Sequence, residues 1–278
     1  MMRQENYSEN YKKLTQDEIK KIEFALLTEF ASYCDAHGFR YYLCGGTLLG
    51  AIRHQGFIPW DDDIDVLMPR PDYEKFIKTN TQEKRFPMGT IENGSANIPF
   101  AKLFDDETFI EQKYSKCIGM SHLWIDVFPM DGLPHSKNIL KRRYKIARFL
   151  RKMLTLSESN FATGTSVIKR IAKILMYPVA RIVGAGRWAD WLNRYSQKES
   201  FEACEDIGGI VWGYGPQESM KKSEYLPYIE VLFEGQYFHA PLCWDQYLKN
   251  LYGDYMELPP EKERLNHSMS AWKRVNNG

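Results

Sequence analysis

Apolar residues near the start of the chain recur at the spacing of one helix face. In residues 15–37 they fall at Ile19, Ile22, Phe24, Leu26, Leu27 and Phe30. Thr15 and Glu18 have the spacing of a capping box, and Gly38 is a typical residue at a helix end. The pattern therefore predicts a helix over residues 15–37.

The period of the apolar residues then changes several times within a short stretch. FRYYLCGG (39–46) predicts a strand that ends in a glycine turn, and TLLGAIRH (47–54) predicts a short helix. DIDVLMP (63–69) predicts a second strand, and PDYEKFIKT (71–79) predicts a helix with proline in its first turn. Helices and strands therefore alternate in this part of the chain.

Further strands and one more helix are expected downstream. Short strands are predicted near residues 90–92, 100–104 and 108–112, and LWIDVFPM (123–130) gives the clearest strand pattern. Near the C-terminus, the pattern predicts a hairpin over 233–241 and a helix over 243–260 that is broken at Gly253. This order of elements indicates an α/β or α+β fold.

Residues 137–198 have a composition unlike that of the rest of the chain. They hold fifteen lysines and arginines against Glu158 and Asp190, although the net charge of the whole chain is only +1. Their pattern is that of basic amphipathic helices. They are either a solvated helical insertion or a surface that meets an anionic membrane or an anionic lipid-linked substrate. No nucleic-acid-binding motif accompanies the charge, so we do not expect a nucleic-acid partner.

The overall composition is that of a globular protein with a sizeable core. Of its 278 residues, 44% are hydrophobic and 26% are charged. The first residues lack the apolar core of a signal peptide, and no apolar run has the length of a membrane span. The cysteines form no CxxC or Cys/His cluster, so neither a disulfide framework nor a zinc site is expected. These features predict a cytoplasmic protein with reduced thiols.

Three aspartates at alternate positions give the sequence its most specific chemistry. Asp63 and Asp65 would lie on the same face of a strand, ~6.6 Å apart along it. Asp61 would lie at the mouth of that strand. Like charges this close repel one another unless a cation holds them, and Mg²⁺ prefers such oxygen ligands. We therefore predict a Mg²⁺ site, with Mn²⁺ as a substitute.

Two further features fit the handling of phosphate near these aspartates. Gly45 and Gly46 allow a close approach of the backbone, and the helix that starts at Thr47 offers free N–H groups to an anion. Asp126 is an isolated acid in an apolar strand, where an unpaired charge is costly. It is either a third carboxylate of the metal site or the partner of a buried arginine or backbone group.

The stretch GGTLLGAIRHQGFIPWDDDIDVLMPR (45–70) resembles the signature of the LicD family along its full length. The ending YGDYMELPP…H (252–267) resembles the C-terminal pattern of that family. The resemblance implies an α+β fold, with a nucleotidyltransferase-like mixed sheet flanked by helices. It also implies a catalytic core over residues 1–136, a basic helical insertion over 137–200, and a C-terminal part over 201–278 that completes the catalytic domain.

The resemblance also implies an activity. LicD-type enzymes are phosphotransferases that move phosphocholine from CDP-choline to a sugar hydroxyl of a glycan such as teichoic acid or lipopolysaccharide, releasing CMP. Related branches transfer a polyol phosphate, so glycerol phosphate or ribitol phosphate from a CDP donor stays an alternative. A second alternative is nucleotidyl transfer from a nucleoside triphosphate. A binding module without catalysis is disfavoured, since the set of four acids is complete.

Carried onto this chain, the resemblance assigns roles to particular side chains. The implied metal ligands are Asp61, Asp63, Asp65 and Asp126. The residues implied to line the donor phosphates or the diphosphate are Gly45, Gly46, Thr47, Arg53, His54 and Lys102. Asp126 and His54 are the two candidates for the general base. His54 can equally make a structural hydrogen bond, and Lys102 can pair with a neighbouring acid.

A choline cargo would need aromatic faces around its quaternary ammonium group. The candidate aromatic residues are Trp60, Trp212, Tyr214, Trp244, Tyr252 and Tyr255, each of which can instead be a core residue. Glu218 and Asp254 are acids that can assist. The basic segment would suit a lipid-linked glycan acceptor at the inner face of the plasma membrane, with peripheral membrane contact through residues 137–198.

Overall fold

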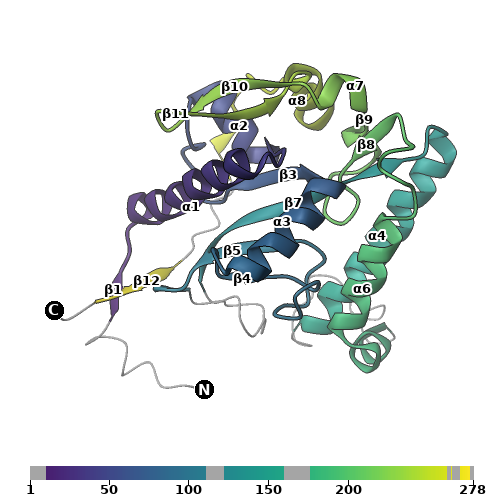
Figure 1. Cartoon of the computed structure of the whole chain (residues 1–278), viewed down its shortest axis with the longest axis horizontal. Coiled ribbons are helices and arrows are strands. Elements are labelled where there is room, and N and C mark those ends of the chain that lie inside the picture. Colours follow the sequence, from purple (N-terminus) through teal and green to yellow (C-terminus); the bar gives the residue numbers. More distant parts are fainter. Residues whose placement is uncertain (1–10, 111–121, 160–175, 262–263, 265–269, 276–278) are drawn as a thin grey trace.

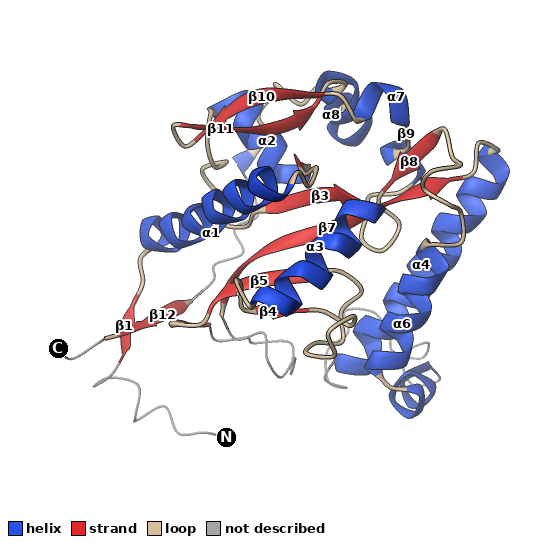
Figure 2. Cartoon of the chain, viewed as in Figure 1, coloured by secondary structure: helices blue, strands red, loops and turns tan. Residues whose placement is uncertain are grey.

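The computed structural model describes residues 11–110, 122–159, 176–261, 264 and 270–275 (Figure 1). These residues form the expected α+β arrangement, with strands at the centre and helices around them (Figure 2). Cys117, His267 and the part of the predicted basic helices that falls at 160–175 lie outside the described residues. Within the described residues, no helix has the length and apolar character that crossing a membrane requires.

The central sheet is mixed. Its strands run in the order β2, β3, β7, β5, β4, with the bounds Tyr42–Leu43, Asp65–Pro69, Leu123–Leu133, Ala101–Asp105 and Met88–Gly89. Strands β3 and β7 are parallel, whereas the other neighbouring pairs in this order are antiparallel. The end of β7 also pairs with β8 (Asp206–Gly208), which pairs with β9 (Met220–Lys221). Strand β7 therefore joins the sheet to the C-terminal third of the chain.

Two smaller sheets complete the strands. One consists of β1 (Tyr11–Lys13), β12 (Ala271–Arg274) and β6 (Thr108–Ile110). The other is the hairpin of β10 (Tyr228–Phe233) and β11 (Gln236–Pro241).

Helices α1 (Gln16–His37) and α3 (Arg70–Glu83) cover one face of the central sheet (Figure 1). They contact each other through Phe30 and Phe76, whose ring centroids lie 5.3 Å apart. Both rings belong to the buried cluster that includes Ile125 and Val127 of β7. The main core therefore lies between these helices and the sheet. The opposite face of β7 is not covered by α1 or α3.

The remaining helices lie in two groups. Helices α2 (Gly45–His54) and α8 (Trp244–Tyr252) pack beside the hairpin, near α7 (Lys222–Tyr225) (Figure 1). Helices α4 (Lys137–Glu158) and α6 (Ala185–Ser196) form a pair, and α4 also touches the short 3₁₀ helix η2 (Pro216–Glu218).

The N-terminal helix confirms its sequence signals. Helix α1 starts after Thr15, whose side chain accepts from the Glu18 N–H while Glu18 returns the capping bond. It ends at Gly38, which has a φ of 66°. A left-handed residue of this kind is tolerated best when it is glycine.

The segment after α1 differs from the prediction. The strand expected over 39–46 shrinks to β2, and α2 begins at Gly45 rather than at Thr47. Gly45 has a φ of 53°, so it turns the chain directly from strand into helix. Strand β3 was predicted from residue 63 but begins at Asp65, the first residue that pairs with β7. Asp61 and Asp63 therefore precede the strand and do not alternate along it.

Several downstream predictions are confirmed, and two are wrong. The helix predicted over 243–260 ends at Tyr252, and residues 254–260 form turns and coil. The hairpin exists, the helix before Gly253 is α8, and the strong strand over 123–130 is β7, which continues to Leu133. The strand near 90–92 is wrong, because residues 91–94 form a turn and the strand β4 lies before them. The predicted domain boundaries stay predictions.

The basic segment is attached to the rest of the fold by a buried network. Arg70 of α3 forms two bonds to the carboxylate of Asp131 in β7, of 2.7 and 3.0 Å. The same guanidinium donates to Asn193 and Ser196 of α6. Arg70 and Asp131 are almost fully buried, so this pair fixes α6 against the end of β7.

Candidate active site

Three of the predicted site residues form one row across the central sheet. Asp65 of β3 is the register partner of Asp126 in β7, and Asp126 is the partner of Lys102 in β5. Neighbouring strands in register bring such side chains to the same face of a sheet. Since Ile125 and Val127 belong to the core on the opposite face, the row is directed away from α1 and α3.

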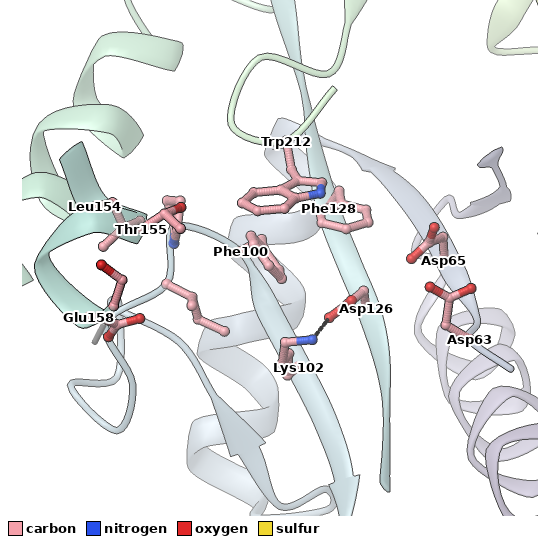
Figure 3. A pocket seen from close by; sticks show the side chains of 13 residues that line it. Asp63, Asp65, Phe100, Lys102, Asp126, Phe128, Leu154, Thr155, Glu158 and Trp212 are labelled. Carbon is pink, nitrogen blue, oxygen red and sulfur yellow. Dashed lines mark ion pairs between the residues drawn. The ribbon is translucent and has the colours of Figure 1, made fainter. Parts of the chain in front are cut away.

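This row borders a cavity of about 370 Å³ between the sheet and α4 (Figure 3). Asp63 and Asp65 lie on one side, Asp126 and Lys102 at the centre, and Thr155 and Glu158 of α4 on the other side. The remaining lining residues are Ile98, Pro99, Phe100, Phe128, Leu154, Ser159 and Trp212. A concave site with a few convergent charges on an apolar wall is typical of ligand pockets.

Lys102 and Asp126 form a close ion pair at the centre of the cavity. The Lys102 Nζ lies 2.6 Å from Asp126 Oδ1, and the Trp124 Nε1–H donates to Asp126 Oδ2 at 3.1 Å. Lys102 Nζ also lies over the Trp124 ring, 4.0 Å from its centroid. Burial raises the pKa of Asp126, although Lys102 and Trp124 act in the opposite direction. The sequence predicted either a metal ion or a basic or backbone group as the partner of Asp126. In this structure the partner is Lys102.

Asp65 lies in an excess of negative charge. Burial raises its pKa well above the usual value, and the charges of Asp63, Asp126 and Asp61 raise it further. Lys102 lowers the pKa, but it does not outweigh those causes. Among the described residues, no lysine, arginine or histidine forms an ion pair with Asp65. The site would therefore gain from a bound cation.

The four-carboxylate metal set is not preformed. In the part of the chain that the structure describes, no group of three or more His, Cys, Asp or Glu side chains is placed to hold a metal ion. Asp126 forms an ion pair with Lys102 in this structure. Asp63 and Asp65 line one cavity, however, and Mg²⁺ is commonly held by one or two carboxylates plus substrate phosphates. The donor set therefore fits a metal completed by substrate.

The glycine pair lies against the acids, as expected. A Cβ at Gly45 would lie 3.3 Å from Asp65 Oδ2, and one at Gly46 would lie 2.6 Å from Asp61 Oδ2. Any side chain at Gly46 would therefore displace the Asp61 carboxylate. Thr47 is buried, and its hydroxyl accepts the N–H of Asp65 at 2.8 Å. Thr47 thus fixes the start of β3, and a role of these residues in phosphate binding stays a prediction.

Arg53 and His54 are not brought to the acids. They lie at the opposite end of α2 from Gly45, and neither lines the cavity just described nor its neighbour. Arg53 donates to the carbonyl of Tyr255 at 2.8 Å and to His54 Nε2 at 3.1 Å. Burial and the Arg53 charge lower the pKa of His54. Their positions favour the structural interpretation, since Arg53 anchors the segment after α8.

A second cavity of about 200 Å³ adjoins the first and shares Asp65, Phe128 and Trp212 with it. Its other lining residues are Cys44, Gly45, Leu67, Gly213, Tyr214, Glu218 and Tyr247. Of the aromatic residues predicted from the sequence, Trp212 and Tyr214 line it. Tyr252 contacts the Tyr214 hydroxyl at 3.1 Å.

The other residues proposed for the cargo lie elsewhere. Trp60 contacts Arg53 and Arg264, and Tyr255 donates to Asp245 at 2.7 Å. Trp244 and Asp254 line neither of the two cavities.

Sequence reasoning missed two contributions to this region. Thr155 and Glu158 come from the basic segment, in which the sequence predicted no site residue. Glu23 of α1 is buried, and its pKa is raised first by burial and then by Asp62 and the neighbouring aspartates. A signal for Glu23 existed, because it falls four residues after Ile19 on the buried face of the helix.

Comparisons of the sequence with known proteins identify the family to which this chain belongs. The family described as LicD/FKTN/FKRP, nucleotidyltransferase domain, matches residues 38–164. The lipopolysaccharide cholinephosphotransferase LicD of Haemophilus influenzae is 32% identical over 268 residues, which cover 92% of this chain and 97% of that protein. The chain belongs to the LicD family, and it is a phosphotransferase enzyme.

Other relatives match shorter parts of the chain. The human and mouse ribitol 5-phosphate transferases FKRP are each 59% identical over 32 residues, covering 12% of this chain and 6% of theirs. An uncharacterised protein of Rickettsia typhi is 29% identical over 122 residues, covering 44% of this chain and 38% of its own.

Proposed function

We propose that this enzyme transfers phosphocholine from CDP-choline to a sugar hydroxyl of a cell-surface glycan precursor and releases CMP. The observation that carries the proposal is the similarity to the cholinephosphotransferase of Haemophilus influenzae, because it extends over 92% of this chain. The cavity supports it, since carboxylates and Lys102 meet on one apolar wall. The acceptor class is a lipopolysaccharide or a teichoic acid precursor.

In the proposed reaction, the acceptor hydroxyl attacks the phosphorus that carries choline. A new bond forms between that phosphorus and the sugar oxygen. The bond to the bridging oxygen of the diphosphate breaks, and its electron pair leaves with CMP. The hydroxyl proton passes to a carboxylate. Asp126 is the candidate acceptor of that proton, because it lines the cavity and His54 does not.

We further propose that Asp63 and Asp65 hold Mg²⁺ in this reaction. Asp61, beside Gly46, lies at the edge of the same acidic group. When bound, the metal would neutralise charge on the phosphates and on the departing CMP. Lys102 is the cationic side chain among the residues lining the cavity, so it adds positive charge at the same place. Positioning and electrostatics suffice for phosphoryl transfer, and no covalent nucleophile is required.

A polyol phosphate is the second candidate cargo. The FKRP proteins are ribitol 5-phosphate transferases, and their likeness to this chain is higher in identity, at 59%, but restricted to 32 residues. A match of that length can reflect shared handling of the CDP part, with the cargo recognised elsewhere. Phosphocholine is therefore the better supported cargo.

A product assay tests the function. Purified protein is incubated with CDP-choline, CDP-glycerol or CDP-ribitol, together with Mg²⁺ and an extract of lipid-linked glycans, and CMP release is recorded. We expect CMP from CDP-choline. The Asp63→Asn/Asp65→Asn double variant should lose at least about a hundredfold in rate. Asp106→Asn, which changes an exposed aspartate, is the matched control and should keep the wild-type rate.

The other outcomes separate the alternatives. CMP from a polyol donor only would replace the cargo and keep the reaction type. Diphosphate released from a nucleoside triphosphate, with no CMP from any CDP donor, would move the chain to nucleotidyl transfer. Unchanged CMP release by the double variant would refute the role of the two carboxylates.

We also propose that the enzyme meets its acceptor at an anionic membrane surface on the cytoplasmic side. The support is the exposed basic side of α4, where Lys141, Lys145, Arg148 and Lys152 follow one another at helical spacing. A polyprenyl-linked precursor would bring its own anionic phosphate to such a surface.

A further inference from the structure

The second cavity lies beside the acidic cavity, where it could receive the transferred group. The two cavities share three lining residues, Asp65, Phe128 and Trp212. A donor whose reacting phosphate lies beside Asp65 would therefore direct its substituent into one of the two spaces. The second is the smaller, at about 200 Å³ against 370 Å³.

The walls of this second cavity are aromatic. Trp212, Tyr214, Tyr247 and Phe128 contribute rings to it, and Tyr214 is held in place by Tyr252. Tyr214 and Tyr252 pack edge to face, with centroids 5.8 Å apart. The hydroxyl of Tyr214 lies 3.6 Å from the position of a Cβ at Gly45, so the ring reaches the start of α2 beside the acids.

The floor of the cavity carries a buried carboxylate, Glu218. Its Oε2 accepts the N–H of Tyr214 at 2.9 Å, and its Oε1 accepts the Tyr247 hydroxyl at 3.4 Å. Only 4% of Glu218 is exposed. Burial raises its pKa to about 7, because these hydrogen bonds only partly replace water.

Within the described residues, no lysine, arginine or histidine forms an ion pair with Glu218. The charge of Arg151 lowers the pKa of Glu218, although the two side chains form no ion pair. Its guanidinium donates instead to the carbonyls of Gly213 at 3.1 Å and Ile210 at 3.3 Å, and it stacks on Trp212. A buried acid without an ion-pair partner, facing an aromatic cavity, favours a ligand that brings a positive charge.

The chemistry of the walls selects the type of cation. A primary ammonium or a guanidinium would need several hydrogen-bond acceptors, whereas a quaternary ammonium group donates none and is held by ring faces. A polyol would need polar partners for each hydroxyl, which ring faces do not supply. The four aromatic residues, together with the carboxylates of Glu218 and Asp65, therefore match a quaternary ammonium group best.

We propose that Trp212, Tyr214, Tyr247 and Glu218 form the subsite that holds the quaternary ammonium of the donor. The subsite rests on the proposed function and identifies the part of the fold that selects choline over a polyol. Loop residues 209–213 close it, since a Cβ at Gly213 would lie 2.5 Å from Glu218 Oε2. The selecting residues thus follow the basic segment in the sequence and lie outside the 45–70 signature.

Ligand binding tests this subsite separately from turnover. Affinities of the full chain for CDP-choline, for CDP-glycerol and for CMP are measured by calorimetry, with and without tetramethylammonium as competitor. We expect Tyr214→Ala and Glu218→Gln to weaken CDP-choline binding about tenfold and to leave CMP binding within twofold. Tetramethylammonium should compete with CDP-choline and not with CMP.

Two further variants make the test specific. Tyr214→Phe keeps the ring and should bind CDP-choline like the wild type, whereas a loss equal to that of Tyr214→Ala would refute a role of the ring face. Tyr237→Ala removes an exposed ring of the hairpin and is the matched control. The comparison of Tyr214→Ala with Tyr214→Phe decides the question independently of Glu218→Gln.

The outcomes distinguish this subsite from the proposed function. If the wild type binds CDP-choline and all variants bind it equally, the subsite is refuted and phosphocholine transfer stands. If the wild type binds CDP-glycerol or CDP-ribitol more tightly than CDP-choline, both the subsite and the phosphocholine cargo are refuted.

Discussion

At the scale of single residues, the ion pair of Lys102 and Asp126 holds the centre of the candidate site together. Both side chains are largely buried, with 11% and 14% of their side-chain surface exposed. Removing one partner of a buried pair leaves the other charge without compensation, which typically costs about 3–5 kcal/mol. Removing both charges avoids that penalty.

We therefore predict strong coupling between these two positions. Lys102→Met should lower the free energy of unfolding by about 3 kcal/mol or more, and adding Asp126→Asn should recover most of the loss. Urea unfolding of the wild type, both single variants and the double variant measures the coupling. Lys249→Met, which breaks an exposed ion pair with Asp245, should cost less than about 1 kcal/mol. Additive effects at 102 and 126 would contradict the prediction.

Glu218 gives a second prediction at this scale, a dependence of stability on pH. Its pKa rises on folding from 4.5 to about 7, so between these values the folded state binds more protons than the unfolded state. Stability then falls as pH rises through this window, by about 3 kcal/mol in full. The groups facing Glu218 are the N–H of Tyr214, the hydroxyl of Tyr247 and the more distant Arg151.

The variant Glu218→Gln should remove this dependence. We expect it to be more stable than the wild type at pH 8, by up to about 3 kcal/mol, and close to the wild type at pH 4.5. Chemical unfolding at both pH values measures the difference, and Glu257→Gln on the surface is the control. If the free energies of unfolding of the wild type and of Glu218→Gln differ by the same amount at both pH values, the raised pKa of Glu218 is refuted.

At the scale of elements, the sequence predicted the helices and strands whose start, end and apolar pattern lie within one short stretch of the chain. Helix α1 carries its cap, its stop and its apolar face within its own residues, and the hairpin carries its turn. Strands β2 and β4 are two residues each, too short for any periodicity to show. Their existence depends on pairing with β3 and β5, which only the folded sheet provides.

The same distinction applies to the site. The sequence from Gly45 to Asp65 predicted that the acids and the glycine pair lie close together, and they do. The Lys102 pairing with Asp126 follows from strand register, and the contribution of Thr155 and Glu158 follows from how α4 packs. Contacts between segments so distant in sequence leave no local pattern to read.

The Arg70–Asp131 pair is an element-scale prediction, because it joins α3, β7 and α6. Asp131→Asn should destabilise the protein by about 3–5 kcal/mol, since Arg70 would stay buried without its ion-pair partner. Asp190→Asn, which breaks the exposed pair with Arg194, should cost less than about 1 kcal/mol. Urea unfolding gives both values.

Hydrogen exchange locates the effect of the Asp131 variant. Amides of α6 should exchange faster in Asp131→Asn than in the wild type. The Asp131 carboxylate holds Arg70 in place, and Arg70 in turn donates hydrogen bonds to Asn193 and Ser196 of α6. Unchanged exchange in α6, together with a loss of stability elsewhere, would show that the network does not attach this helix.

At the scale of the whole molecule, charge is distributed very unevenly. Residues 137–198 hold fifteen basic side chains against two acids, while the complete chain has a net charge of +1. In α4, the two features lie at different positions along the helix. Its last turn lines the acidic cavity through Thr155 and Glu158, and its earlier turns expose lysines and arginines together with Phe149, which is 47% exposed. One helix can therefore hold the protein at a surface and border its active site.

This arrangement predicts binding to anionic vesicles. Neutralising Lys141, Lys145, Arg148 and Lys152 to glutamine should weaken binding to vesicles that contain phosphatidylglycerol by at least about tenfold, since each basic residue near such a surface contributes about 1 kcal/mol. Co-sedimentation at about 0.05 M and about 0.3 M salt measures the affinity and its screening by salt. Neutralising the exposed Lys13, Lys21, Lys75 and Lys78 changes the net charge equally and should leave binding near the wild-type value. Equal losses in both variants would mean that net charge alone governs the contact, and no loss in either would refute a membrane-facing role of α4.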